Sequence, residues 1–147
     1  MFKTILLGLT TLSLALAFNA QGAPKKHEAF TLDELKWQPS PEHPKEVQMA
    51  VISGNPMKGA HTAYHKFSPG FTAPDHTHTA TLKTVVVAGP IVTGAPGKEK
   101  SLPAGSYYIL PGGWVHTTKC DSDDSCVIFV EANGKFDVRP TGAKKSK

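Results

Sequence analysis

Three histidines are the residues of this chain whose type and spacing best fit metal chemistry. His76 and His78 are separated by one residue, and His116 follows a glycine-rich turn later in the chain. Side chains alternate between the two faces of a β-strand, so His76 and His78 are expected to point the same way. Imidazole binds Zn, Fe, Cu and Ni, and His116 on a neighbouring strand would supply a third nitrogen. The pattern therefore predicts a metal site with three histidine ligands.

Glycines and prolines stand at fixed offsets around these histidines. The chain resembles the cupin superfamily, whose first motif reads Gly, five residues, His-x-His, three or four residues, Glu, six residues, Gly. The second motif of that superfamily reads Gly, five residues, Pro-x-Gly, two residues, His. The matching glycines, proline and histidines are Gly70, His76, His78, Gly89, Gly105, Pro111, Gly113 and His116. The resemblance implies an all-β, single-domain fold, the cupin-like double-stranded β-helix or jelly-roll barrel.

The glutamate of the first cupin motif is missing. A three-residue spacing after His78 places Leu82 at its position, and a four-residue spacing places Lys83 there. Neither side chain can bind a metal. The chain is similar to an uncharacterised, often secreted cupin subfamily with an apolar or basic residue at this point, and the run 136–138, Phe-Asp-Val, is also similar to that group. The expected cofactor is one divalent transition metal ion (Zn, Fe, Ni or Cu, with Mn added by the resemblance) in an open site formed by His76, His78 and His116.

Two further residues are candidates for binding a substrate. Alternation over 60–67 puts His61, His65 and Phe67 on one face, so His65 faces the metal or a substrate if Phe67 faces the core. The alternative is an ordinary core or rim histidine. Lys83 is a candidate cation at the mouth of the barrel, with a surface lysine as the alternative. Asp75 has the opposite parity to His76 and is interpreted as a loop acid. His27 and His43 lie in irregular segments and are assigned no role. No residue is assigned a catalytic role.

The two cysteines, Cys120 and Cys126, bracket a polar turn between two expected strands. A disulfide across this hairpin is the expected state in an oxidising compartment. The alternative follows from strand parity, which puts Cys120 on the same face as His116. A free Cys120 thiolate would then lie near the metal.

The ends of the chain differ in character from its middle. A positive start at 1–3, an apolar run over 5–18 and small residues at 20–23 predict a signal peptide over 1–23, with a retained transmembrane helix as the alternative. The protein is therefore expected to be periplasmic or secreted. The remaining divisions are an N-terminal arm with a short helical turn (24–45), the barrel (46–140) and a basic tail (141–147). Much of the net charge of +4 lies in the terminal segments, which are interpreted as solvated ends.

Many short strand patterns separated by glycine and proline indicate a β-sandwich or barrel. Thr31 and Glu34 are expected to cap a helical turn, and Trp37 to cover one end of the barrel. The prolines within 38–44 argue against a regular element there, and 95–100 reads as an exposed turn. Strands are predicted over 47–53, 60–67, 71–78, 83–87, 91–93, 106–110, 115–118 and 127–131.

Two functional hypotheses follow. The first is an exported metal-binding cupin whose open three-histidine site acts on or binds a small organic molecule. The second is a non-catalytic cupin that binds a small ligand or acts as a sensor, with weak or no metal. No phosphate-binding loop, nucleophile elbow or paired carboxylates point to another enzyme class. Export argues against nucleic acid, no membrane contact is expected after cleavage, and the resemblance implies a homodimer.

Overall fold

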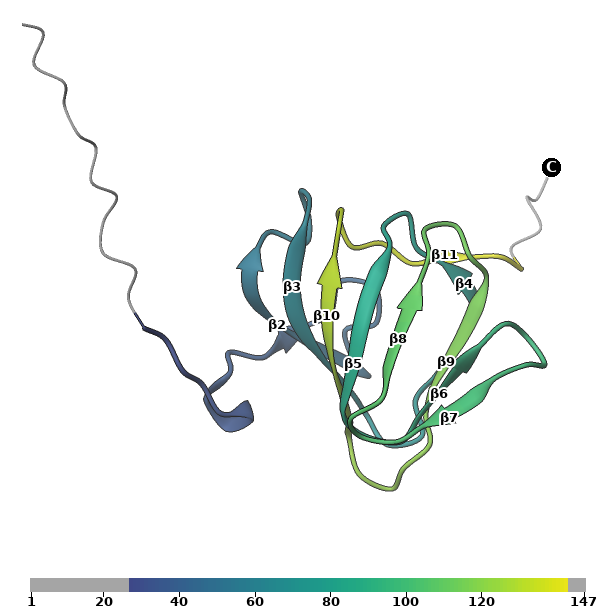
Figure 1. Ribbon diagram of the computed structural model, residues 1–147, viewed down its shortest axis with the longest axis horizontal. Helices are drawn as coiled ribbons and strands as arrows, with labels where there is room; N and C mark the ends of the chain where they lie inside the picture. Colours follow the sequence, from purple (N-terminus) through teal and green to yellow (C-terminus); the bar gives the residue numbers. More distant parts are fainter. Residues whose placement is uncertain (1–26, 143–147) are drawn as a thin grey trace, which may run out of the picture.

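Residues 27–142 are described by a computed structural model, in which the strands form two antiparallel sheets (Figure 1). The six-stranded sheet has the order β1 (Gln38–Pro39), β2 (Val47–Gly54), β3 (His61–Phe67), β10 (Cys126–Ala132), β5 (Leu82–Ala88) and β8 (Tyr107–Leu110). The five-stranded sheet has the order β11 (Arg139–Pro140), β4 (Thr72–Thr77), β9 (His116–Cys120), β6 (Ile91–Gly94) and β7 (Lys100–Leu102). The all-β jelly-roll prediction is confirmed. The predicted signal peptide and most of the basic tail lie outside the described residues.

Alternating burial along the strands shows which face of each sheet is inside. In β3, every second residue from His61 to Phe67 is buried, and the residues between them are partly exposed. β9 shows the same alternation from His116 to Cys120. This period of two is expected for strands with one face against a core and the other toward solvent. The histidines that lie on these inner faces are therefore held inside the barrel.

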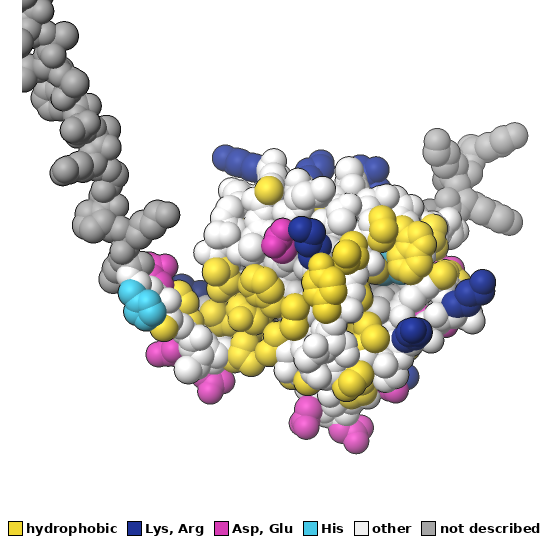
Figure 2. Space-filling model, viewed as in Figure 1, with side chains coloured by type: hydrophobic (Ala, Val, Ile, Leu, Met, Phe, Trp, Pro, Cys, Tyr) yellow, Lys and Arg dark blue, Asp and Glu magenta, His cyan; other side chains and the backbone are white. Residues whose placement is uncertain are grey.

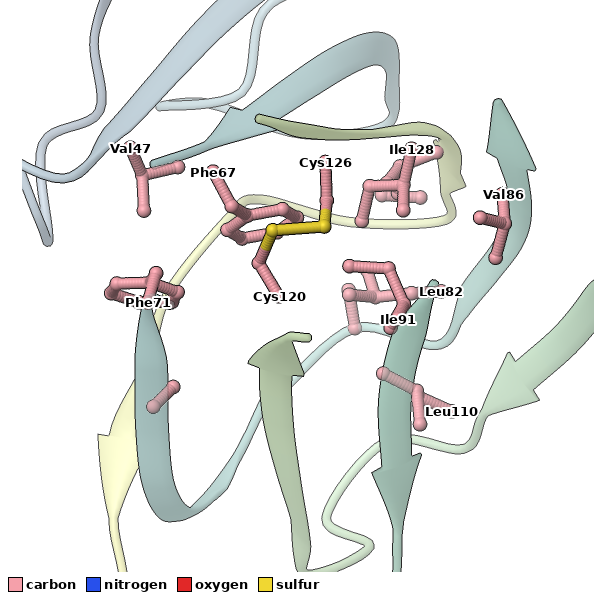
Figure 3. Close-up of a cluster of buried hydrophobic side chains, with 14 residues drawn as sticks. Val47, Phe67, Phe71, Leu82, Val86, Ile91, Leu110, Cys120, Cys126 and Ile128 are labelled. Carbon is pink, nitrogen blue, oxygen red and sulfur yellow. A yellow bond between two sulfur atoms is a disulfide. The ribbon is translucent and has the colours of Figure 1, made fainter. Parts of the chain in front are cut away.

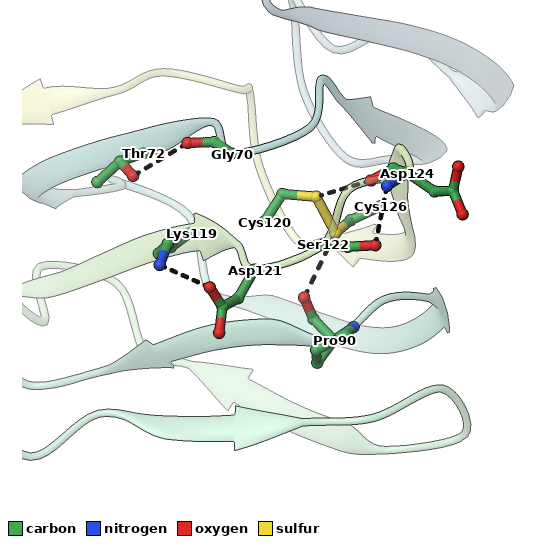
Figure 4. The surroundings of a disulfide bond; sticks show 9 residues. All are labelled: Gly70, Thr72, Pro90, Lys119, Cys120, Asp121, Ser122, Asp124 and Cys126. Carbon is green, nitrogen blue, oxygen red and sulfur yellow. Dashed lines mark hydrogen bonds and ion pairs between the residues drawn. A yellow bond between two sulfur atoms is a disulfide. The ribbon is translucent and has the colours of Figure 1, made fainter.

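The core lies between the two sheets, and part of it lines the same pocket as His76 and His78. Phe67 and Phe71 stack there with ring centroids 5.5 Å apart (Figure 3). The predicted disulfide between Cys120 and Cys126 is present, and both residues are fully buried (Figure 4). Cys120 shares the inner face of β9 with His116, as parity predicted, but its sulfur is bonded to Cys126 and is no free thiolate at the metal site.

The structure corrects several details of the strand prediction. Gln38–Pro39 pairs with β2 despite its proline, because a two-residue strand at a sheet edge needs few backbone donors. Lys100–Leu102 pairs with β6, although the predicted exposed turn over 95–100 included Lys100. Arg139–Pro140 pairs with β4 and was not predicted at all. These short strands have too few residues to show an alternating pattern.

The short helix η1 (Leu32–Glu34) begins as predicted, because the Glu34 carboxylate accepts hydrogen bonds from the Thr31 backbone N–H (2.7 Å) and hydroxyl (3.1 Å). The prediction for Trp37 is wrong. Its ring lies beneath the ammonium of Lys66, 4.0 Å from the ring centroid, and Lys66 projects from the outer face of β3. A cation–π contact on the outside of the sheet therefore replaces the expected cover at the barrel end.

The outer face of the six-stranded sheet carries exposed apolar side chains. Val85 on β5 and Tyr107 and Ile109 on β8 are among them. Hydrophobic side chains gather over the front of the molecule in Figure 2, where Figure 1 places these strands. No helix within residues 27–142 is both long enough and apolar enough to cross a membrane.

Candidate metal centre

The structure brings His76, His78 and His116 together inside the barrel. His76 on β4 and His116 on β9 are paired across adjacent antiparallel strands, and His78 follows the end of β4. All three are buried, and their candidate ligand nitrogens lie within 4.8 Å of one another. Three nitrogens gathered this closely could hold one metal ion, for which the normal metal–nitrogen distance is about 2.1 Å.

Each of the three rings is oriented by a backbone carbonyl. The Nδ1 atom lies 2.7 Å from the Pro74 oxygen in His76, 2.5 Å from the Asp137 oxygen in His78, and 3.0 Å from the Trp114 oxygen in His116. A carbonyl only accepts hydrogen bonds, so each Nδ1 carries the proton and each Nε2 keeps its lone pair for a metal. The Nε2 of His116 is buried without a hydrogen-bond partner, as expected of a ligand position.

Burial also keeps these rings neutral, which is the state that binds a metal. Loss of hydration lowers the pKa of His116 to about 4, although the Trp114 carbonyl opposes the shift. Burial lowers the pKa values of His76 and His78 as well, against the opposing effect of their own carbonyl partners. At neutral pH, protons therefore do not compete with a metal for these nitrogens.

The glycine-rich turn of the second motif packs directly on the loop after β4. The Gly113 N–H donates to the His78 carbonyl at 2.8 Å, and the Gly112 N–H donates to the Thr81 hydroxyl at 3.1 Å. A Cβ atom at Gly112 would lie 2.5 Å from the Thr79 carbonyl oxygen, a distance that no side chain permits. Gly113 has a φ of 76°, in the left-handed region that favours glycine. The turn therefore positions His78 and leads the chain into His116.

A C-terminal segment holds the same loop from the other side. The Asp137 carboxylate accepts hydrogen bonds from the Thr79 backbone N–H (2.8 Å) and hydroxyl (2.5 Å), and it pairs with Arg139 at 2.9 Å. Burial alone would raise the Asp137 pKa, but these partners together lower it, so the carboxylate stays ionised. Since the Asp137 carbonyl orients His78, Asp137 links the loop after β4, the candidate ligand His78 and Arg139 of β11.

A pocket of about 50 Å³ opens beside the histidines and is mainly apolar. His76 and His78 line it, and the rings of both lie against His116, with centroids 4.2 and 5.1 Å away. Phe136 and Val138 from the C-terminal segment also line the pocket. Among residues 27–142, no Asp, Glu, Lys or Arg contributes to its lining.

Leu82, and not Lys83, faces the inside of the barrel at the position of the missing glutamate. Leu82 is buried, lines the pocket and pairs with Leu110 of β8. Lys83 points to the outer face of β5, is exposed, and forms an ion pair with Glu131 at 3.3 Å. The structure therefore does not bring Lys83 to the histidines, and the three-residue spacing of the first motif describes this chain.

His65 lies on the inner face of β3 and lines the same pocket. Its ring packs edge-on against Phe136 at 5.2 Å, and its buried Nε2 has no hydrogen-bond partner. Burial, with smaller effects from His61 and His78, lowers the His65 pKa to about 3. His65 is thus a neutral polar group that faces the pocket with unused hydrogen-bonding capacity.

Sequence reasoning missed His43, which also lines the pocket and packs edge-on against Phe71 at 5.4 Å. It lies in an irregular segment, so no periodic pattern indicates which way its side chain points. The role of Asp137 was missed as well, although the run 136–138 was noted for its resemblance to a cupin subfamily. Asp75 is exposed, as expected for a loop acid.

Comparisons with known proteins agree with this fold. No curated protein is a significant match to the chain. The polyketide cyclase RemF from Streptomyces resistomycificus is similar in structure, with 18% identity and a TM-score of 0.67 over 82% of this chain and 89% of that chain. KdgF from Halomonas sp. is 21% identical, with a TM-score of 0.57 over 74% of this chain and 94% of that chain.

A third structure is the Rhodobacter sphaeroides complex of SigE with the anti-sigma ChrR. It has 20% identity to this chain and a TM-score of 0.55, over 70% of this chain and 51% of that chain. At such identities, the three structures support the fold alone. The family model described as the ChrR cupin-like domain matches residues 25–136, which is most of the chain. This protein therefore belongs to the ChrR cupin-like domain family of the cupin superfamily.

Proposed function

We propose that this protein is an exported metal-binding cupin, in which His76, His78 and His116 hold one divalent transition metal ion and present it to a small organic molecule. The observation that carries the proposal is the arrangement of the three imidazoles. Their Nδ1 atoms are all occupied by carbonyls, and the Nε2 of His116 is buried without a partner. A metal ion would be the partner for the Nε2 lone pairs that this arrangement leaves free of protons.

Three protein ligands leave coordination positions open, which is the arrangement of catalytic metal sites. When bound, the metal would supply Lewis-acid polarisation or oxygen activation. The chain's own contribution is a mainly apolar pocket, together with His65, which we propose as a hydrogen-bonding partner for the bound molecule. The outward position of Lys83 gives no support to the substrate-binding role predicted for it.

A second candidate is a non-catalytic sensor or ligand-binding module. The match to the ChrR cupin-like domain favours it, because that name belongs to an anti-sigma factor in the SigE complex. The small pocket and the missing fourth ligand are also consistent with a module that binds metal weakly.

Elemental analysis of the untagged full chain tests the choice between the two. The proposed function predicts about one divalent transition metal per chain after dialysis. A metal content near zero, which stays near zero after incubation with Zn²⁺, Mn²⁺, Fe²⁺, Ni²⁺ or Cu²⁺ and dialysis, would favour the second candidate. Export is tested by the N-terminal sequence of protein from the periplasm or medium, which should begin after the predicted signal peptide, near residue 24.

The homodimer implied by the cupin resemblance is also a proposal. The exposed apolar side chains on the outer face of the six-stranded sheet support it, since apolar patches on a protein surface often mark an interaction site. The mass measured by sedimentation should be that of a dimer, and Ile109→Lys should shift it toward a monomer. A monomeric wild-type protein at high concentration would contradict this proposal.

A further inference from the structure

The chemistry around the three histidines specifies the class of molecule that the open positions accept. A divalent ion held by three neutral imidazoles keeps both of its positive charges, because none of its protein ligands is anionic. In an apolar surrounding, an uncompensated charge is costly. The charge must then be balanced by whatever occupies the remaining positions.

The protein offers no anion of its own inside the pocket. Leu82 stands where the cupin motif has its glutamate; it is buried, pairs with Leu110 and lines the same pocket as His76 and His78. The ionisable side chains that line the pocket within residues 27–142 are histidines and Tyr108. Burial raises the Tyr108 pKa, so this side chain remains a neutral phenol.

The two acids nearest the histidines lie outside the pocket and are not available as ligands. The Asp137 carboxylate is occupied by Thr79 and by the guanidinium of Arg139. Asp75 precedes His76 on β4, and its side chain is exposed to solvent, where water screens its charge. Neither group replaces the missing carboxylate at the metal.

The remainder of the pocket fits an apolar body. Leu82, Phe136 and Val138 present apolar surface, while His65 offers one hydrogen-bonding nitrogen without a partner in the protein. A space of about 50 Å³ holds about four water molecules, which is comparable to a ligand of a few non-hydrogen atoms.

We propose that the site binds a small monoanion with an apolar body, whose anionic oxygen takes the coordination position that Leu82 leaves open and accepts a hydrogen bond from His65. The proposal rests on the proposed function, since it requires the metal. A simple carboxylate such as propionate is the model ligand. Propionamide has the same shape without the charge.

The test uses the full chain loaded with Co²⁺, whose visible absorption bands report its coordination. Propionate is expected to shift these bands with saturation, and propionamide to bind roughly 100-fold more weakly because it brings no charge to the metal. Leu82→Glu should keep Co²⁺ but lose propionate binding, since the new carboxylate supplies the charge and fills the position. Leu82→Gln is the matched control, since it has the size of glutamate without its charge and should retain the preference for propionate over propionamide.

The outcomes distinguish a failure of the anion inference from a failure of the proposed metal-binding function. If Co²⁺ binds through the histidines but propionate and propionamide bind equally well, or neither binds, the anion inference is overturned while the metal function stands. If Leu82→Glu still binds propionate as tightly as the wild type, the inference is also overturned, because the Leu82 position then does not set the charge. If the wild-type chain binds no Co²⁺, the proposed function fails and this inference fails with it.

Discussion

His76 on β4 and His116 on β9 face each other as a register pair of adjacent antiparallel strands, with their ring centroids 4.2 Å apart. Cross-strand pairing fixes two ligands of the proposed metal centre through the backbone ladder of the five-stranded sheet. His78 lies beyond the end of β4 and depends instead on the Gly113 N–H and the Asp137 carbonyl. The proposed site thus combines a cross-strand pair of histidines with a third histidine that is held by contacts from two loops.

The first prediction concerns metal binding itself. His76→Ala combined with His78→Ala leaves a single imidazole of the three-histidine cluster, so metal content should fall from about one ion per chain to nearly zero. Elemental analysis after dialysis measures this, with His27→Ala as a control because His27 is exposed and lies far outside the cluster. Full metal occupancy in the double variant would show that these histidines are not the ligands.

The second prediction tests how Asp137 positions a ligand. Asp137→Ala removes the carboxylate that holds Thr79 and Arg139, and with it the restraint on the carbonyl that orients His78. Loss of such a supporting contact typically weakens metal affinity by about 10- to 100-fold. A competition titration with a chelating dye measures the change. Asp75→Ala is the matched control, since its exposed side chain makes no such contact, and equal effects of the two substitutions would contradict the positioning role.

Sequence alone predicts the cluster of three histidines, because each of them is accompanied by a local signal. Strand alternation aligns His76 with His78, and the Pro111–Gly113 turn marks the approach to His116. His43 and Asp137 have no comparable signal. Their places in the site depend on how irregular segments pack after the sheets have formed, and neither segment has a periodic pattern.

Sequence alone also could not decide whether Leu82 or Lys83 takes the position of the missing glutamate. One residue of difference in the loop after His78 exchanges the inner and outer faces of the next strand. The sequence leaves this loop length open. The register of β5 against β8, with Leu82 opposite Leu110, decides it.

The third prediction concerns stability and pH in the metal-free protein. The pKa of His65 is lowered to about 3 and that of His116 to about 4, from an ordinary value of 6.5. As pH falls below 6.5, the unfolded chain takes up protons that the folded chain does not, so the free energy of unfolding falls. Each such histidine contributes about 1.4 kcal/mol per pH unit, with the His116 contribution ending near pH 4 and that of His65 near pH 3.

Urea unfolding at pH 7, 5.5 and 4.5 in the presence of a chelator measures this slope. His65→Gln removes one titrating ring while keeping a polar group, so its slope should be smaller than that of the wild type by about one proton. His27→Gln, at an exposed position, should leave the slope unchanged. The same slope in His65→Gln and in the wild type would mean that His65 is not a buried neutral ring.

The fourth prediction separates the disulfide from the metal site. Replacing Cys120 and Cys126 with alanine opens a short loop and should lower the free energy of unfolding by about 2 kcal/mol, with a further loss from packing. Metal content should not change, because Cys120 lies at the opposite end of β9 from His116. A loss of metal in the double variant, with the fold intact by circular dichroism, would contradict this separation.

The last prediction uses the two candidate positions of the missing glutamate as a matched pair. Leu82→Glu places a carboxylate on the inner face of β5, toward the histidines, whereas Lys83→Glu places one on the outer face beside Glu131. A fourth, anionic oxygen ligand should raise the affinity for Mn²⁺ more than that for Zn²⁺, because Mn²⁺ favours oxygen ligands. Titration of Mn²⁺ followed by electron paramagnetic resonance should therefore show tighter binding in Leu82→Glu and no change in Lys83→Glu.

The free energy of unfolding provides a second comparison of Leu82→Glu with Lys83→Glu. Without metal, the carboxylate of Leu82→Glu is buried without a partner, which should cost several kcal/mol of unfolding free energy and be partly recovered when Mn²⁺ is added. Lys83→Glu replaces an exposed ion pair with two exposed like charges, so the loss of unfolding free energy should stay at about 1 kcal/mol with or without Mn²⁺. A gain of Mn²⁺ affinity in Lys83→Glu, or none in a folded Leu82→Glu, would mean that Leu82 does not face the three histidines.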